Sequence, residues 1–329
     1  MRRLIPLVAA ALLLAGCGTS AAERAAQSST AQASAQGYPV EVVSCGQTLR
    51  FDAPPKKVLV LGATGYSNLE ALGLADQVAL RAGVAHFDAA DPQLQAKHDA
   101  IPAVDSGRTD TGGVTLSTEV ALKSGIDLVI GYDKGVDREA LAKAGIRLYS
   151  PEAYCPSYNG GQASWTMVEE ELTKLATIFG RPDSAQRAVA DLRAQTGRLT
   201  AQAGASRGSA AALYMPAGAT KLRVYGVSSM VQPIFEANGL TNAYGDSAKR
   251  VFDGSMEDLL ARNPDWVVLL SSDASEADTV ATFMAFNGAT RLKAVEKNQV
   301  VVLPFVLTDP PNALSVKGAT VLSQKLQPK

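Results

Sequence analysis

Residues 182–204 read PDSAQRAVADLRAQTGRLTAQAG. Proline suits the first turn of an α-helix, and apolar side chains then recur at helical spacing along one face. A helix of about 21 residues at about 1.5 Å of rise per residue is a rod about 30 Å long, roughly the width of one domain. The stretch therefore predicts a helix that links two lobes, one at residues 37–181 and the other at residues 205–329.

Short β-branched runs alternate with helical stretches on both sides of this helix. Before the helix, the sequence predicts strands at Val58–Leu61, Val78–Arg81, Leu128–Ile130 and Arg147–Tyr149. After it, the sequence predicts strands at Ala210–Met215, Val267–Leu270 and Val300–Leu303. Such alternation is typical of mostly parallel sheets covered by helices. We therefore expect an α/β fold with two Rossmann-like lobes, a single long α-helix that joins them, and a ligand cleft between the lobes.

Two short motifs recur in the same order in both halves of the chain. Glu70–Gly73 (EALG) resembles Glu236–Gly239 (EANG), and each glycine suits the left-handed backbone that ends a helix. Ser117–Glu119 (STE) resembles Ser255–Glu257 (SME), and a predicted buried strand follows each. The preserved order indicates that the halves share one plan, and chance repetition of common helix-end signals is the alternative.

The N-terminus has the order of charge, apolar run and small residues that an export signal requires. Arg2 and Arg3 precede the apolar run Leu4–Leu14, which is too short for a transmembrane helix. Leu14–Cys17 (LAGC) looks like a bacterial lipobox within a signal peptide at residues 1–17, so we expect a lipid on Cys17. An ordinary cleaved signal peptide is the alternative. Residues 18–36 are mostly Ala, Ser, Gln and Thr, which predicts a disordered tether.

The composition argues against some partners and leaves two cysteines for the folded part. Lys and Arg number 31 against 32 for Asp and Glu, without a basic stripe, so nucleic acid is not an expected partner. With Cys17 lipidated, Cys45 and Cys155 remain in a chain exported to an oxidising compartment. A disulfide between them is favoured, and it would stabilise the fold by about 4–5 kcal/mol by closing a loop of about 110 residues. Two separate buried thiols are the alternative.

The sequence lacks the residue patterns that are typical of enzyme active sites and metal sites. His86 and His98 are the only 2 histidines, and neither has the spacing of a zinc helix or a nucleophile elbow. Gly62–Gly65 lies between a predicted strand and a helix, but no nucleotide-binding fingerprint is complete there. We expect no catalytic residue, no metal site and no cofactor, so any iron arrives already chelated. An extracytoplasmic α/β enzyme is the alternative from another class.

Candidate ligand contacts follow the predicted strands, because ligands of α/β sheets lie beyond the carboxyl ends of the strands. In the first lobe they are Tyr66, Arg81, Arg108, Tyr132, Tyr154 and Tyr158. In the second lobe they are Tyr214, Arg223, Tyr225, Met230 and Phe305. Tyrosine offers a flat apolar face with a hydroxyl, and arginine offers planar charged donors. The set suits a catecholate, a hydroxamate chelate or a tetrapyrrole, although each residue alone also fits a core edge or a solvated surface.

Glu119 and Glu257 occupy equivalent positions in the two halves, each in the first turn of a predicted helix. An acid there interacts favourably with the helix dipole by about 0.3–1 kcal/mol, so a structural role is sufficient for either one. As a pair, however, they can present matching charges to a dimeric receptor.

The order of motifs along the mature chain resembles the helical-backbone class of ABC-importer binding proteins, which carry iron-siderophores, haem and cobalamin. The motifs are Cys45-Gly46, Ala53–Val58 (APPKKV), Asn68–Gly73 (NLEALG), Glu257–Asp265 (EDLLARNPD) and Asp309–Ser315 (DPPNALS). The resemblance implies a rigid linking helix, modest closure on the ligand, and one glutamate per lobe that engages arginines of the permease dimer. Those glutamates correspond to Glu119 and Glu257. Gly125–Asp127 departs from the Pro-Asp pattern that Pro264-Asp265 keeps.

We therefore expect a monomeric, non-enzymatic solute-binding protein that delivers a ferric siderophore to the permease dimer of an ABC importer. Its place would be the cell membrane, lipid-anchored through Cys17 on the extracytoplasmic face. A haem, cobalamin or deazaflavin-precursor ligand is the alternative within the same class.

Overall fold

The computed structural model describes residues 37–87, 91–108, 113–132, 135–155, 158, 160–202, 206–272 and 275–327. The expected signal peptide, the lipidated Cys17 and the tether at 18–36 lie outside the described residues. Within the described ranges, no helix combines the length and the apolar character that crossing a membrane requires.

The first lobe is built on a five-stranded parallel sheet, with the strand order β5-β4-β3-β8-β9. Its strands are β3 (Val58–Leu61), β4 (Val78–Ala82), β5 (Ala103–Val104), β8 (Leu128–Ile130) and β9 (Arg147–Tyr149). Its helices are α2 (Ala63–Ala71), α3 (Pro92–Asp99), α4 (Thr118–Lys123), α5 (Arg138–Lys143) and α6 (Trp165–Ile178). Two antiparallel hairpins complete it, β1 (Val40–Ser44) with β2 (Gln47–Phe51) and β6 (Gly107–Arg108) with β7 (Val114–Thr115).

The second lobe is built on a six-stranded mixed sheet, with the order β13-β11-β10-β14-β15 and β12 paired to β10. Its strands are β10 (Ser209–Tyr214), β11 (Leu222–Tyr225), β12 (Thr241–Asn242), β13 (Val251–Gly254), β14 (Trp266–Ser271) and β15 (Val300–Pro304). Its helices are α8 (Val231–Glu236), α9 (Met256–Arg262), α10 (Glu276–Met284), α11 (Lys293–Glu296) and α12 (Ser315–Lys325). The strands β10, β14 and β15 are parallel, whereas β11 runs antiparallel to both of its neighbours, β10 and β13.

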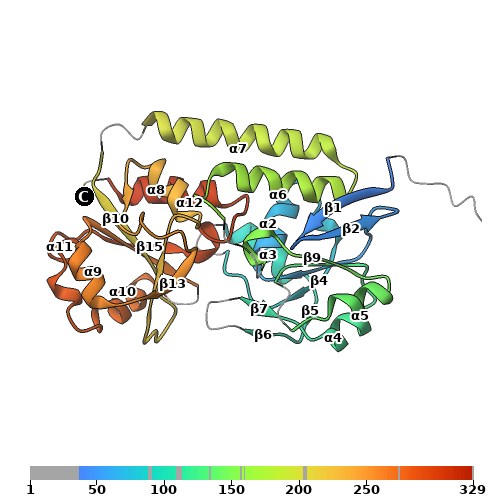
Figure 1. The fold of residues 1–329 in the computed structure, drawn as a ribbon, viewed down its shortest axis with the longest axis horizontal. Helices are drawn as coiled ribbons and strands as arrows, with labels where there is room; N and C mark the ends of the chain where they lie inside the picture. Colours follow the sequence, from blue (N-terminus) through green and yellow to red (C-terminus); the bar gives the residue numbers. More distant parts are fainter. Residues whose placement is uncertain are drawn as a thin grey trace, which may run out of the picture.

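The long helix α7 (Pro182–Gln202) runs along both lobes (Figure 1). It packs against α6 of the first lobe and α12 of the second. On this side of the molecule one hydrophobic cluster continues through both lobes, and Asn68 Oδ1 accepts a hydrogen bond at 2.8 Å from the Ala313 N–H across the lobe boundary. The predicted fold class is therefore confirmed: two α/β lobes are joined by a single long helix.

The repeated motifs form equivalent structures in the two lobes. Gly73 and Gly239 have φ values of 68° and 70°, and each follows the end of a helix that leads toward a strand. Ser117 Oγ accepts a hydrogen bond from Val120 N–H at 3.2 Å, and Ser255 Oγ accepts one from Asp258 N–H at 3.1 Å. Each serine thus satisfies an N–H group that its helix leaves unpaired. The two lobes share a plan at the level of individual hydrogen bonds.

His98 lies at the end of α3, inside the aromatic core of the first lobe. Its ring contacts Tyr66 and Phe87 edge-on, at centroid distances of 5.1 and 5.3 Å, and its side chain is 1% exposed. Nδ1 is 3.5 Å from Asp99 Oδ1 without hydrogen-bond geometry. Burial, followed by the charge of Arg81, lowers the pKa of His98, and Asp99 only partly opposes this shift.

This environment predicts a stability that depends on pH. An unfolded chain takes up a proton at His98 near pH ~6.5, whereas the folded protein does so only at lower pH. The free energy of unfolding should therefore fall as pH drops below about 6.5, by at most about 1.4 kcal/mol per pH unit from this group. Urea denaturation of the wild type and of His98→Phe from pH 7.5 to 5 measures the difference. Parallel curves for the two proteins would contradict the prediction.

Candidate ligand-binding site

A cavity of about 550 Å³ lies between the lobes. This volume is in the range that small-molecule ligand sites occupy. Six of the predicted contacts line the cavity, namely Tyr132, Tyr154, Tyr158, Tyr214, Tyr225 and Phe305. The first three come from the first lobe and the last three from the second, so both lobes face the same space.

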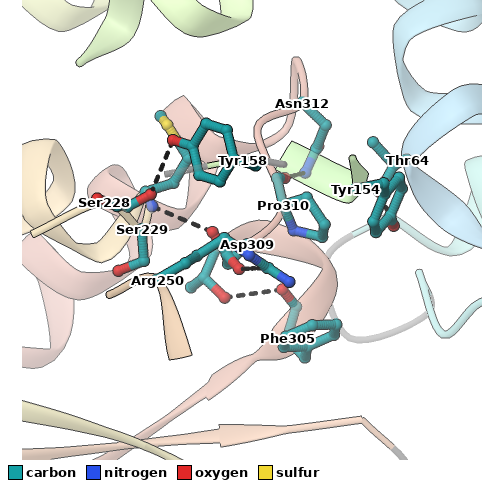
Figure 2. A network of polar contacts seen from close by, with 12 residues as sticks. Thr64, Tyr154, Tyr158, Ser228, Ser229, Arg250, Phe305, Asp309, Pro310 and Asn312 are labelled. Atoms are coloured by element: carbon teal, nitrogen blue, oxygen red, sulfur yellow. Dashed lines mark hydrogen bonds and ion pairs between the residues drawn. The ribbon is translucent and has the colours of Figure 1, made fainter. Parts of the chain in front are cut away.

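The first lobe contributes a wall of tyrosines, Tyr132, Tyr154 and Tyr158, which contact neighbouring side chains and backbone. The Tyr154 hydroxyl is 3.1 Å from Thr64 Oγ1, and its ring lies 5.7 Å from the ring of Tyr132. The Tyr158 hydroxyl donates to the carbonyl oxygen of Ser228 in the second lobe at 3.2 Å (Figure 2). Burial raises the pKa of Tyr154 and of Tyr158. Both phenols therefore stay protonated near neutral pH and keep a hydroxyl that can donate a hydrogen bond.

The second lobe contributes aromatic side chains from the ends of its strands. Tyr214, the last residue of β10, contacts Phe305 edge-on at a centroid distance of 5.1 Å, and its hydroxyl is 3.0 Å from Ser272 Oγ. Tyr225 is the last residue of β11, and burial raises its pKa well above its usual range. In the antiparallel pairing of β10 with β11, Tyr214 lies opposite Arg223, so Tyr225 is only two residues away along the pair, and both tyrosines line the cavity.

Arg250 is one of two described charged residues that line the cavity, and it is paired with a buried carboxylate. Its Nη1 donates to Oδ2 of Asp309, whose side chain is fully buried, and Asp309 Oδ1 accepts from Met230 N–H at 3.1 Å (Figure 2). The Arg250 side chain is 22% exposed and lines the cavity. The neighbouring Lys249 also lines the cavity, with its Nζ 5.8 Å from the centre of the Phe252 ring. Asp309 offsets one of these two positive charges, so their net effect is cationic.

A smaller hollow of about 60 Å³ adjoins the cavity and shares Tyr132, Tyr154 and Phe305 with it. Arg108 and His86 line this hollow, beside the start of α2. Arg108 is therefore near the main cavity without facing it directly.

Four of the predicted contacts line neither space, and each has another role. Tyr66 is 1% exposed and packs on His98, because α2 begins at Ala63 and turns this side chain toward the core. Arg81 donates from Nε to the Ile101 carbonyl at 3.0 Å and from Nη1 to the Gly83 carbonyl at 3.2 Å. Arg223 pairs with Asp253 across β11 and β13 at 2.6 Å, and Met230 is fully buried. The structure therefore places these four side chains outside the lining of both spaces, and a contact with the ligand stays a prediction for each of them.

Sequence reasoning did not select Ser228, Lys249, Arg250 or Asp309. The Lys249-Arg250 pair precedes β13, a four-residue antiparallel strand that no strong apolar run signals. Ser228 follows β11, which was also not predicted, and its hydroxyl donates to the Ala248 carbonyl at 2.6 Å. Asp309 was visible only as part of the Asp309–Ser315 motif. The charge of Asp309 within this motif is the signal that could have marked it as a site residue.

The predicted docking acids lie at exposed helix starts, outside the cavity lining. Glu119 in α4 has a side chain that is 75% exposed and 2.5 Å from Lys123 Nζ. Glu257 in α9 is also exposed. Neither helix lies beside α7 (Figure 1). Both side chains are therefore open to a partner.

The two remaining cysteines form the expected bond. Cys45 and Cys155 are joined by a disulfide, with their Cα atoms 5.0 Å apart. Among the residues that the structure describes, no cluster of three or more His, Cys, Asp or Glu side chains is arranged to hold a metal ion.

Aromatic side chains from both α/β lobes thus line one cavity, which has a size typical of small-molecule ligand sites. A family model described as periplasmic binding protein matches residues 58–307, and the chain belongs to this family. Its members and the neighbouring structures are substrate-binding transport proteins rather than enzymes, which confirms the non-enzymatic prediction.

Several solved structures are similar to this chain. A crystal structure described as an ABC-type Fe3+-hydroxamate transport system from Saccharomonospora viridis is 32% identical, with a TM-score of 0.80, covering 88% of this chain and 100% of that one. A periplasmic heme-binding protein from Pseudomonas aeruginosa is 20% identical, with a TM-score of 0.64 and coverages of 82% and 91%. A periplasmic vitamin B12 binding protein from Vibrio cholerae is 18% identical, with a TM-score of 0.59 and coverages of 83% and 97%. The last two show the fold alone. No curated protein matches the chain.

Proposed function

We propose that the protein captures a ferric siderophore in the cavity between its lobes and delivers it to an ABC importer. The observation that carries this proposal is the ring of six aromatic side chains, from both lobes, beside Arg250 and Lys249. The 32% identity to a protein described as part of an Fe3+-hydroxamate transport system supports the same ligand class.

The chemistry of the cavity suits an iron that arrives with its own oxygen ligands. Protonated phenols such as Tyr154 and Tyr158 donate hydrogen bonds to the outer oxygens of a chelate, while the flat rings cover its conjugated parts. Arg250 donates one hydrogen bond to Asp309 from Nη1. The other N–H groups of its guanidinium offer charge-assisted hydrogen bonds to hydroxamate, catecholate or carboxylate oxygens. An anionic or neutral chelate is favoured over a strongly cationic one, because the net charge of this wall is positive.

The rest of the proposal concerns where the protein works. A lipid on Cys17 would hold it at the extracytoplasmic face of the cell membrane, as a monomer tethered through residues 18–36. Glu119 and Glu257, one on each lobe, would engage the two halves of the permease. Their exposure and their equivalent serine-capped helix starts support this role.

Fluorescence titration of the protein from residue 18 onward tests the ligand class. We expect one of the ferric siderophores, among them the neutral trihydroxamate ferrichrome, to quench the tyrosine and tryptophan emission with a submicromolar Kd. Haem, cobalamin and a deazaflavin are the comparison ligands. Tight binding by one of these alone would replace the proposed ligand, and silence from every compound would contradict the proposal.

Two variants connect the titration to the cavity. Tyr154→Ala removes a hydroxyl and a ring from the wall, and we expect it to raise Kd about tenfold, as expected for a lost hydrogen bond together with lost aromatic contact. Tyr66→Phe is the matched control, because Tyr66 lies in the core away from the cavity. Equal effects of the two changes on Kd would place the ligand elsewhere.

A further inference from the structure

The Cys45–Cys155 disulfide lies in the wall of the ligand cavity. Cys155 is 5% exposed, and it lines the cavity together with Tyr154 and Tyr158, which are one and three residues away in the sequence. Its partner is 110 residues distant in the chain, at the turn of the β1–β2 hairpin. The bond therefore connects the aromatic wall to an element that does not itself line the cavity.

The described part of this wall from Ser150 to Cys155 has little regular structure of its own. After β9 it forms a single short turn, Glu152–Tyr154, in which Tyr154 N–H donates to the Pro151 carbonyl at 2.8 Å and Cys155 N–H to the Glu152 carbonyl at 3.0 Å. Such bonds between near neighbours set the local shape but do not fix the segment relative to the sheet. A bond from Glu152 N–H to Glu171 Oε1 at 3.0 Å anchors the start of the turn. The disulfide anchors its end.

The hairpin on the other side of the bond is firmly held. Its strands pair over five residues in antiparallel register, and β1 packs on α6. Ser44 Oγ donates to the Ser150 carbonyl at 3.0 Å and accepts from Ser150 N–H at 2.8 Å, both in buried surroundings. The residue before Cys45 is thus fixed to the end of β9. Through the disulfide, the hairpin also holds Cys155, which is five residues after Ser150.

The tyrosines next to Cys155 depend on accurate placement. The Tyr154 hydroxyl meets Thr64 at the start of α2, while Tyr158 reaches across the lobe boundary to the Ser228 carbonyl. A shift of the backbone at Cys155 would move both contacts, one within a lobe and one between lobes.

We infer that the Cys45–Cys155 disulfide is a positioning element of the ligand site, which holds Tyr154 and Tyr158 in the geometry that binds ligand. Its role is preorganisation, because a wall that is already fixed loses less conformational entropy on binding. The inference rests on the proposed function only for the choice of ligand probe.

Hydrogen–deuterium exchange tests the positioning without any ligand. In the variant Cys45→Ala with Cys155→Ala, we expect amides of residues 150–155 to exchange at least about tenfold faster, a larger increase than the lower overall stability produces in α7 and β14. Leu192→Ala is the control, since it removes a buried side chain from α7, far along the chain from the cavity wall. It should lower Tm without selective loss of protection at residues 150–155. Unchanged exchange at these residues in the double variant would overturn the inference.

Titration with ferrichrome, a neutral ferric trihydroxamate, provides the second readout. We expect Kd to rise about tenfold in the double alanine variant at a temperature well below its Tm, and to stay unchanged in Leu192→Ala. A wild-type Kd together with a lower Tm would mean that the bond only stabilises the fold. If the wild type does not bind ferrichrome, the titration uses the ferric siderophore that it does bind. If it binds none, the ligand proposal fails on its own, and the exchange experiment still decides the positioning role.

If the double alanine variant does not fold, the same test can be made by reducing the disulfide in the folded wild-type protein. Dithiothreitol, a dithiol, supplies two electrons and two protons, so that the S–S bond becomes two thiols and the reagent closes to a cyclic disulfide. The thiol count then reports the fraction reduced, and exchange at residues 150–155 should accelerate in step with it. Full reduction without faster exchange would overturn the inference.

Discussion

Cells that carry Glu119→Lys together with Glu257→Lys are expected to lose uptake of the ligand, while the purified protein binds that ligand with unchanged Kd. Both side chains are exposed at the start of serine-capped helices, one in each lobe, and neither lines the cavity. Placing like charges opposite one another at an interface costs several kcal/mol and slows association. Reversal on both lobes should therefore remove uptake, and reversal on one lobe should reduce it.

The chain offers matched controls for this experiment. Glu139 also lies in the first turn of a short helix of the first lobe, is 86% exposed and pairs with the lysine four residues on. Glu276 follows the N-cap Ser275 in the second lobe and is 67% exposed. Glu139→Lys with Glu276→Lys changes the net charge by the same amount. Uptake that survives reversal at Glu119 and Glu257, or that fails equally in the control, would contradict the docking role.

The frame of the fold could be predicted because its signals are local and strong. The strands β3, β8 and β9 match the predicted runs, since buried parallel strands are continuous apolar stretches with clear ends. Pro182 and the apolar face after it marked α7 in the same way. Even the serine caps of α4 and α9 were visible as a repeated pattern.

The antiparallel strands of the second lobe were missed for the opposite reason. Residues 222–225 are mostly buried and residues 251–254 are mostly half-buried, and each run is only four residues long, a length at which periodicity carries little information. The loops beside them hold Ser228 and Arg250. The part of the site that depends on these strands was therefore hidden along with them.

Six of the residues predicted at strand ends line the cavity, and others lie in the core or at the surface. The backbone path at the end of each strand sets the direction of the side chain. Tyr154 follows β9 through an irregular turn and faces the cavity. Tyr66 follows β3 directly into a helix and faces the core. Position in the sequence identifies the edge of the sheet, but the backbone path between strand and helix selects the side chains that reach the ligand.

Asp309→Asn is expected to lower the free energy of unfolding by about 3 kcal/mol, the lower end of the range for breaking a buried ion pair, because Arg250 keeps some contact with water. Asn retains an acceptor for Met230 N–H, so the change removes mainly the charge that faces Arg250. The same variant should also weaken ligand binding, since Arg250 loses the partner that orients it toward the cavity.

A double-mutant cycle isolates the contribution of this pair. In the wild type, Arg250→Met leaves a fully buried carboxylate without its partner, whereas in Asp309→Asn it replaces an already unpaired cation by an apolar side chain. Urea denaturation of the four proteins should therefore give a coupling energy of at least about 1 kcal/mol, with the double variant more stable than the sum of the single changes predicts. Glu139→Gln, at an exposed pair, should cost under about 0.5 kcal/mol. If the losses of unfolding free energy at Arg250 and Asp309 are additive, the coupling energy is zero and the ion pair itself does not stabilise the fold.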